Sequence, residues 1–278
     1  MPDEYALAVL SRWRSLYQPA IQMVREHRTF PPALAVLLGS GLQLELPAAA
    51  EIPYERIPAL PAPTVTGHQG VLRILESRRW NRTILLWSGR FHWYEGFPVE
   101  VIAAPILISA AVGCSSVLLT NAAGGLNPHF AAGDLMLLLD HLNCFPPIPE
   151  LAAFSLRRSP YSAEIRRALV QIGLKLEIPF QQGVYVGVSG PNYETPAEVR
   201  FYRTMGGDAI GMSTVIEATV AATLGMKVAG CSVITNVLSE LPATGVSHTE
   251  VVQASALTAP KLGRILQAVC DDHLPIFL

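Results

Sequence analysis

A tyrosine and a glutamate stand side by side in the segment SGPNYETPAE, at Tyr193 and Glu194. The residues after them predict a helix start, because Thr195 and Glu198 have the spacing of a capping box. The apolar run just before them, residues 184–188, predicts a buried strand. Loops that follow such strands line the crevices in which α/β proteins bind ligands. The ring and the carboxylate could therefore stack on a flat heterocycle and hydrogen-bond to its edge.

A guanidinium, an imidazole and a phenol alternate along the segment GRFHWYEG, at Arg90, His92 and Tyr94. If the segment is extended, these three side chains lie on one side, and Phe91 and Trp93 lie on the other. A guanidinium can hold phosphate through two hydrogen bonds. The alternative is an exposed polar face with a buried aromatic back, and the segment alone favours neither.

Four further segments place small or polar residues where a strand ends or a helix begins: 39–41, 120–127, 211–217 and 232–236. Backbone N–H groups and hydroxyls at such points can hold an anion. The amide of Asn236 can both donate to and accept from a heterocycle. Capping boxes are also predicted at Thr214–Glu217 and at Ser247–Glu250. Each segment alone could also be an ordinary turn or helix start, and for 39–41 and Asn236 alone an ordinary turn is favoured.

The composition favours a small-molecule partner over nucleic acid. Of the 278 residues half are hydrophobic and 15% are charged, and the formal net charge is −2. The four cysteines form no CxxC pair, so neither a disulfide framework nor a zinc site is expected. The N-terminus has no secretory pattern, and residues 101–119 are better explained by a buried helix and strand than by a membrane span. We therefore expect a cytoplasmic protein.

Apolar segments with strand and helix patterns alternate along the chain. Strands are predicted at 33–38, 71–75, 84–87, 117–120, 135–139, 184–188, 209–211 and 228–234. Helices are predicted at 5–27, 98–112, 163–174, 197–205, 215–224 and 249–270, and an irregular connection at 52–63. Such alternation predicts a parallel or mixed sheet covered on both faces. No linker or repeat divides the sequence, so one domain over residues 1–278 is expected.

Taken together, these segments resemble the trimeric purine nucleoside phosphorylases. The shared motifs are, in order, GRFHWYEG, TNAAGGLNP, GDLMLLLDHLN, SGPNYETPAE, GDAIGMSTVIE and SVITN, and the match runs from about Leu34 to the C-terminal helix. The resemblance implies an α/β fold with a central mixed, partly barrel-like sheet, and a homotrimer. It also implies reversible phosphorolysis, in which a nucleoside and phosphate give a purine base and ribose 1-phosphate. No metal or redox cofactor is implied.

Matching positions imply a role for each candidate residue. Phosphate would be held by Ser40, His68, Arg90, His92, the Asn121–Ala122 backbone and Ser213. The ribose would be lined by Tyr94, Met212 and His248, and the base would be held by Tyr193, Glu194 and Asn236. The implied catalytic residues are Asn236, Glu194 and His92, with Asn236 donating to purine N7 as negative charge develops there.

Asparagine at position 236 favours 6-oxopurine nucleosides or deoxynucleosides, such as those of hypoxanthine and guanine, because related enzymes for 6-aminopurines typically carry aspartate there. The alternatives are a phosphorylase for adenosine or methylthioadenosine, a nucleoside hydrolase, and a purine-binding protein without turnover.

The sequence departs from the family pattern in two places. Gln43 stands where the family usually has glycine, and it either crowds the phosphate loop or faces solvent. The segment 144–161 is shorter than in the family, where it supplies a subunit contact and a phenylalanine that reaches the neighbour's ribose pocket. Phe154 could take the place of that phenylalanine. A more open site or a changed trimer interface could follow.

Overall fold

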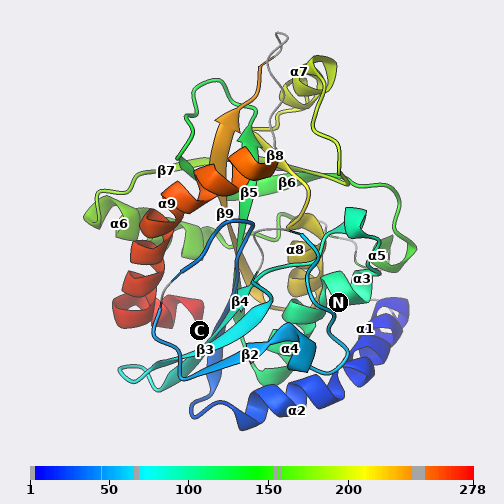
Figure 1. Cartoon of the computed structure of the whole chain (residues 1–278), viewed down its shortest axis with the longest axis vertical. Helices are drawn as coiled ribbons and strands as arrows, with labels where there is room; N and C mark the ends of the chain where they lie inside the picture. The colour runs from blue at the N-terminus through cyan, green and yellow to red at the C-terminus, as the bar shows by residue number, and fades with distance from the viewer. Residues whose placement is uncertain are drawn as a thin grey trace.

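The computed structural model describes residues 4–44, 46–65, 69–152, 154, 156, 158–239 and 248–278. Its strands are β1 (Pro32–Leu37), β2 (Ala50–Pro53), β3 (Val71–Ser77), β4 (Arg82–Ser88), β5 (Ser116–Gly125), β6 (Leu135–Cys144), β7 (Phe180–Val188), β8 (Ala209–Gly211) and β9 (Lys227–Val237). They form one mixed sheet in the order β2-β3-β4-β1-β5-β8-β7-β6-β9 (Figure 1). Because β9 also pairs with β5, the last five strands close into a barrel. The α/β fold with a mixed, partly barrel-like sheet is confirmed.

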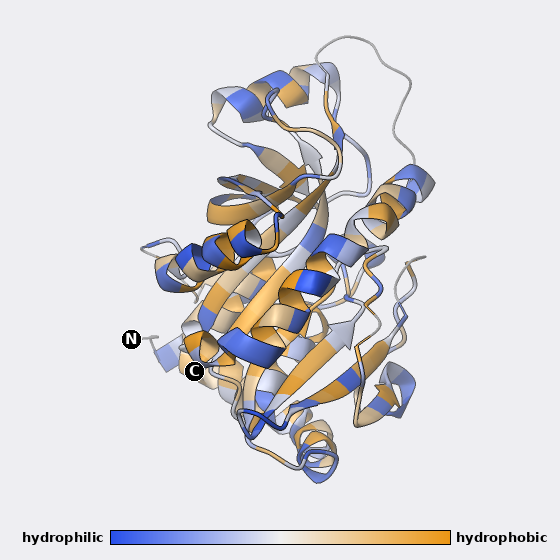
Figure 2. Cartoon of the chain, turned by 90° about the vertical axis from the view of Figure 1, so that its left-hand side faces the viewer, coloured by the Kyte–Doolittle hydropathy of each residue, from blue (hydrophilic) through white to orange (hydrophobic). Residues whose placement is uncertain are grey.

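Helices cover the sheet on both faces. They are α1 (Glu4–Leu16), α2 (Gln18–Glu26), α3 (Val99–Ile102), α4 (Ala104–Val112), α5 (Pro149–Ala152), α6 (Ala163–Lys175), α7 (Pro196–Thr204), α8 (Val215–Thr223) and α9 (His248–Ala268). Strand β1 shows the two-sided burial: Ala35 and Leu37 belong to one apolar cluster, and Leu34 and Val36 belong to another. Successive side chains of a strand point to opposite faces, so a run that is apolar throughout is buried on both. In Figure 2 the central strands are accordingly mainly hydrophobic, whereas the helices also carry hydrophilic residues.

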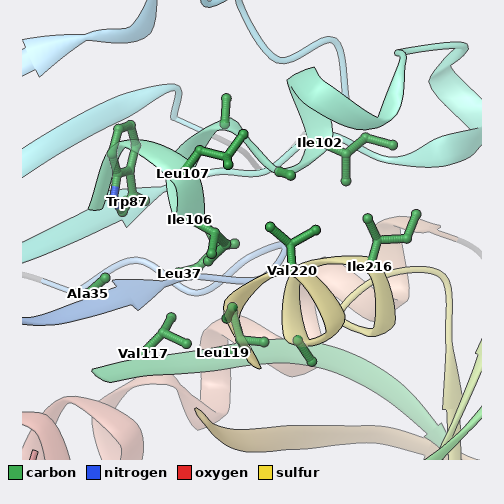
Figure 3. Packing of buried hydrophobic residues seen from close by; sticks show 14 of the residues in the cluster. Ala35, Leu37, Trp87, Ile102, Ile106, Leu107, Val117, Leu119, Ile216 and Val220 are labelled. Carbon is green, nitrogen blue, oxygen red and sulfur yellow. The ribbon is translucent and has the colours of Figure 1, made fainter. Parts of the chain in front are cut away.

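The first cluster lies between the sheet and helices α3, α4 and α8. Ile106 of α4 and Val220 of α8 approach Leu37 and Leu119 of the sheet (Figure 3). Helices α6 and α9 cover the opposite face through the second cluster. These two layers hold the ends of the strands in fixed positions.

Prolines divide two helices that were predicted as continuous. The 5–27 helix is two helices, α1 and α2, with Pro19 in the first turn of α2. The 98–112 helix is also two, α3 and α4, with Pro105 in the first turn of α4. Proline lacks a backbone N–H and its ring clashes with the preceding turn, so it fits the start of a helix and not the interior. Pro260 nevertheless lies inside α9.

Two segments that were predicted to be irregular are partly strands. The 52–63 connection begins with the end of β2 and the 3₁₀ helix Tyr54–Arg56. The TNAAGG segment was predicted as a loop after a strand, and it continues β5 to Gly125 because it pairs with β9. Its polar and small residues do not mark it as a strand; its neighbour in the sheet decides its structure. Among the described residues, no helix combines the length and apolar character needed to span a bilayer.

Candidate active site

One pocket contains every predicted site residue that the structure describes. It lies where the segments after β1, β4, β7 and β8 meet the later parts of β5 and β9. Its lining includes Ser40, Arg90, His92, Tyr94, Asn121, Ala122, Tyr193, Glu194, Met212, Ser213, Asn236 and His248. His68 lies outside the described residues. Segments that are far apart in sequence therefore converge at one edge of the sheet, as ligand sites in α/β folds do.

The glycine loop after β1 lies directly on β5. A Cβ atom at Gly39 would come within 2.7 Å of the Asn121 Cα atom, which is backbone and cannot move aside. The Gly39 N–H donates to Thr120 Oγ1 at 3.1 Å, and Gly41 has a φ of +74°. Only glycine allows this close approach and this backbone conformation. Ser40 is thereby held beside Asn121 in the pocket.

Arg90 is a buried guanidinium at the bottom of the pocket, with 1% of its side chain exposed. Its Nη1 donates to the Thr120 carbonyl at 2.8 Å and to Ser213 Oγ at 2.9 Å. Its Nε lies 3.2 Å from Oε1 of Glu217, which is equally buried. The Nη2 atom has no hydrogen-bond partner among the described residues. A guanidinium with an unused donor in a pocket is well suited to an anion.

Glu217 does not have its expected role. The capping box predicted at Thr214–Glu217 is wrong, because Thr214 makes no side-chain cap and the Glu217 carboxylate faces Arg90. Arg90 and Glu217 are 127 positions apart, and nothing in the sequence pairs them. The box at Thr195–Glu198 is confirmed in both of its hydrogen bonds. The third box includes Ser247, which lies outside the described residues.

Thr214 shapes the turn that presents Ser213. Its φ of +74° and ψ of −44° are unfavourable for a β-branched residue, and the Val215 N–H donates to the Ser213 carbonyl at 2.8 Å. This is a γ-turn of the rare, strained kind. The Asn121 side chain holds the turn by donating from Nδ2 to Thr214 Oγ1 at 2.9 Å. The strain is thus stored beside the Ser213 hydroxyl that Arg90 contacts.

His92 is oriented by Glu95, which was not among the predicted site residues. The His92 Nδ1 lies 2.8 Å from Glu95 Oε1, and the imidazole stacks on Tyr94 with ring centroids 4.9 Å apart. Burial lowers the pKa of His92, although Glu95 opposes this. Burial raises the pKa of Glu95, but hydrogen bonds from the His92 side chain, Thr64 and the His92 backbone outweigh it and hold the pKa at about 2. An ionised Glu95 therefore faces a neutral His92.

The extended conformation considered for GRFHWYEG is only partly correct. Residues Trp93–Glu95 form a 3₁₀ helix, and this turn brings Glu95 back to His92. Arg90, His92 and Tyr94 all reach the pocket, whereas Phe91 is buried in the core. The spacing of His92 and Glu95, three residues apart, was the available signal for their contact.

The opposite wall of the pocket carries Tyr193, Glu194 and Asn236. Tyr193 is 41% exposed and lines the pocket, so part of its side chain remains available for contact. Burial, with added repulsion from Glu198, raises the pKa of Glu194. The Thr235 hydroxyl donates to Asn236 Oδ1 at 2.9 Å, which directs the amide's Nδ2 donor elsewhere. Thr235 also lines the pocket and was not predicted.

Comparison with known proteins accounts for this arrangement. Residues 33–271 match the model of the phosphorylase superfamily. Over 267 residues the chain is 38% identical to purine nucleoside phosphorylase 1 of Bacillus subtilis (strain 168), an alignment that covers 91% of this chain and 97% of the bacterial one. This chain belongs to the purine nucleoside phosphorylase family.

Two further members extend the comparison. The purine nucleoside phosphorylase of Bos taurus is 37% identical over 272 residues, covering 88% of this chain and 91% of that one. The crystal structure of Schistosoma mansoni purine nucleoside phosphorylase in complex with adenosine superposes with a TM-score of 0.79 at 27% identity, over 92% of this chain and 96% of that one. The fold is therefore that of the purine nucleoside phosphorylases.

Within this phosphorylase fold, the structure places one residue from each departure from the family pattern, Gln43 and Phe154. Gln43 is exposed and lies outside the pocket lining, so it faces solvent. The expectation that Phe154 could reach a neighbour's ribose pocket is wrong. Its side chain is 3% exposed and packs edge-on against Trp13 of α1, with ring centroids 5.7 Å apart. Burying the ring in its own core is favourable, and it leaves no aromatic surface at this position to present to a neighbour.

Proposed function

We propose that this member of the family cleaves 6-oxopurine nucleosides and deoxynucleosides, such as inosine and guanosine, with inorganic phosphate. The coarser activity, purine nucleoside phosphorolysis, is that of the family. The observation that carries the specificity is the hydrogen bond from the Thr235 hydroxyl to Asn236 Oδ1. With its oxygen so engaged, the amide presents Nδ2 as a donor. A donor suits the N7 and O6 acceptors of a 6-oxopurine, whereas the 6-amino group of adenine is itself a donor and would find no acceptor on this amide.

The phosphate side supplies the attacking group. Arg90, Ser213, Ser40 and the backbone at Asn121 would hold the anion, with the unused Nη2 of Arg90 as one donor. Neutral His92, whose Nδ1–H donates to the Glu95 carboxylate, offers Nε2 as an acceptor for the proton of hydrogen phosphate. His68 belongs to the same proposal through the family resemblance alone.

The base side stabilises the leaving group. The bond from the sugar C1′ to purine N9 breaks and its electron pair passes to the purine, while a phosphate oxygen forms the new bond to C1′. The proton of hydrogen phosphate ends on the purine. Asn236 donates to N7, where negative charge develops, and this preorganised dipole lowers the barrier. Glu194, as the carboxylate, accepts from N1–H of a 6-oxopurine.

The remaining pocket residues fit the sugar and the base faces. Tyr94, Met212 and His248 would line the ribose, with His248 at the start of α9 reaching the 5′-hydroxyl. Tyr193 would offer its ring to the purine face. No metal is part of the proposal, and the described residues contain no group of three or more acidic, histidine or cysteine side chains suited to one.

The test is the phosphate dependence of nucleoside cleavage by the purified protein. Inosine, guanosine and adenosine are each supplied with and without phosphate, and the free base is measured. Phosphate-dependent cleavage of inosine and guanosine, with little cleavage of adenosine, supports the proposal. Comparable phosphorolysis of adenosine would refute the 6-oxopurine specificity. Adenosine is included because the S. mansoni enzyme was crystallised in complex with it. Cleavage without phosphate would indicate a hydrolase, and binding without turnover a purine-binding protein.

We also propose that the chain forms a homotrimer, as its family resemblance implies. Large apolar side chains such as Leu257, Leu174 and Phe201 are more than half exposed in the single chain, which is consistent with burial between subunits. Light scattering on the purified protein should give three times the 30.0 kDa of one chain. A monomeric or dimeric mass would contradict the trimer and leave the proposed chemistry intact.

A further inference from the structure

One arginine outside the pocket lining ties together the two segments that carry Glu194 and Asn236. Arg203 lies in the last turn of α7 and is half-buried. Its Nε donates to the Leu126 carbonyl at 2.5 Å, and its Nη2 donates to the Leu238 carbonyl at 2.6 Å. Hydrogen bonds from a charged guanidinium to carbonyl oxygens are stronger than neutral ones, and the planar fork fixes their directions.

The two carbonyls mark the ends of neighbouring parallel strands. Leu126 follows β5 and Leu238 follows β9, and the Leu238 N–H donates to the Gly125 carbonyl at 2.9 Å. Leu238 itself lines the pocket, two residues beyond Asn236. Arg203 therefore fixes the backbone of the segment that carries Asn236.

The helix that carries Arg203 directly follows the segment that carries Glu194. The capping box of Thr195 and Glu198 defines the start of α7, and Glu194 is the residue just before it. Val199 anchors the helix in a small apolar cluster with Leu126. In Figure 1, α7 lies at the top of the molecule, near the end of β9. A shift of α7 relative to β9 would change the separation of Glu194 and Asn236.

We infer that Arg203 is a positioning residue that sets the distance between Glu194 and Asn236, and with it the choice of purine. The inference rests on the proposed roles of those two residues. Arg203 does not line the pocket, and it acts on the base through the backbone at Leu238 and through α7. A lysine keeps the charge but has a single nitrogen, so it cannot hold both carbonyls in one plane.

The test compares Arg203→Met and Arg203→Lys with Arg200→Met. Arg200 lies on the same helix and is exposed, and its side chain makes no hydrogen bond among the described residues. Because small misplacements of reacting groups are costly, we expect kcat/KM for inosine to fall by about 10- to 100-fold in both Arg203 variants. The preference for inosine over adenosine should narrow, while the KM for phosphate stays within about twofold and Arg200→Met behaves as wild type.

Each outcome separates the inference from its alternatives. An unchanged inosine-to-adenosine ratio, or an equal rise in the KM for phosphate, would overturn it and leave Arg203 a general stabilising residue. If Arg203→Met does not fold, the same kinetic ratios are measured on Arg203→Lys, which keeps a long aliphatic side chain and the positive charge. If the wild-type protein prefers another purine nucleoside, the proposed specificity fails, and the same ratio is measured against the preferred substrate. The two failures are therefore distinguishable.

Discussion

Replacement of Glu217 by glutamine should lower the free energy of unfolding by about 3–5 kcal/mol. The Glu217 carboxylate lies 3.2 Å from Arg90 Nε, and both side chains are 1% exposed. At that separation and an effective dielectric constant of about 20, the attraction is about 5 kcal/mol. The amide keeps the shape of the carboxylate but leaves the buried charge of Arg90 uncompensated. Removing one partner of a buried pair is therefore far more costly than removing one at the surface.

Urea denaturation of wild type and Glu217→Gln measures this loss directly. Glu164→Gln is the matched control, because the Glu164 carboxylate lies 3.6 Å from Lys227 Nζ and both side chains are well exposed. Its loss should stay below about 1 kcal/mol. Inorganic phosphate should stabilise Glu217→Gln more than wild type, since the anion supplies the charge that Arg90 lacks. The reasoning would be refuted if Glu217→Gln and Glu164→Gln lost equal amounts of unfolding free energy relative to wild type. It would also be refuted if phosphate stabilised wild type and Glu217→Gln equally.

Three further predictions follow from the same geometry. Asn236→Ala should cost about 2–4 kcal/mol of transition-state stabilisation with inosine, seen in steady-state kinetics as a fall in kcat; a change confined to the KM for inosine would argue against its role at N7. Glu95→Gln should lose less stability than wild type as the pH falls from 4.5 to about 2 in urea titrations. In wild type the unfolded chain takes up a proton in this window that the native carboxylate, with its pKa held low, does not; parallel curves would contradict this. Phe154→Ala should destabilise the fold by about 3–5 kcal/mol through lost packing on Trp13 while leaving the KM for inosine unchanged, and a large rise in that KM would place the ring beside a nucleoside.

The sequence predicted the strands and the convergence of the site well, for a physical reason. The run 33–38 is apolar throughout, and 228–234 is apolar except for Ser232, so a strand buried on both faces suits them. Residues such as Ser213 and Asn236 follow or end such strands, so they meet at one edge of the sheet. The capping box at Thr195–Glu198 was equally secure, because it depends on residues three apart.

Two of the failures concern contacts between distant parts of the chain. The same spacing that predicts one capping box correctly also suggests one at Thr214–Glu217, where the fold instead pairs Glu217 with Arg90. The local sequence around Phe154 does not reveal that its ring packs on Trp13, 141 positions earlier. No local pattern specifies which of two possible partners a side chain will meet.

By itself, the sequence determined the alternation of strands and helices, the chemical types available at the strand ends and the order of the family motifs. Hydrophobic periodicity and capping are local, so they can be read from neighbouring residues. Only the tertiary structure decided that Arg90 is held by Glu217, that the Asn236 amide is oriented by Thr235 within a closed barrel, and that Arg203 bridges the ends of β5 and β9. These contacts depend on burial, which strengthens each hydrogen bond and charge pair, and burial exists only once the sheet and its helices have packed together.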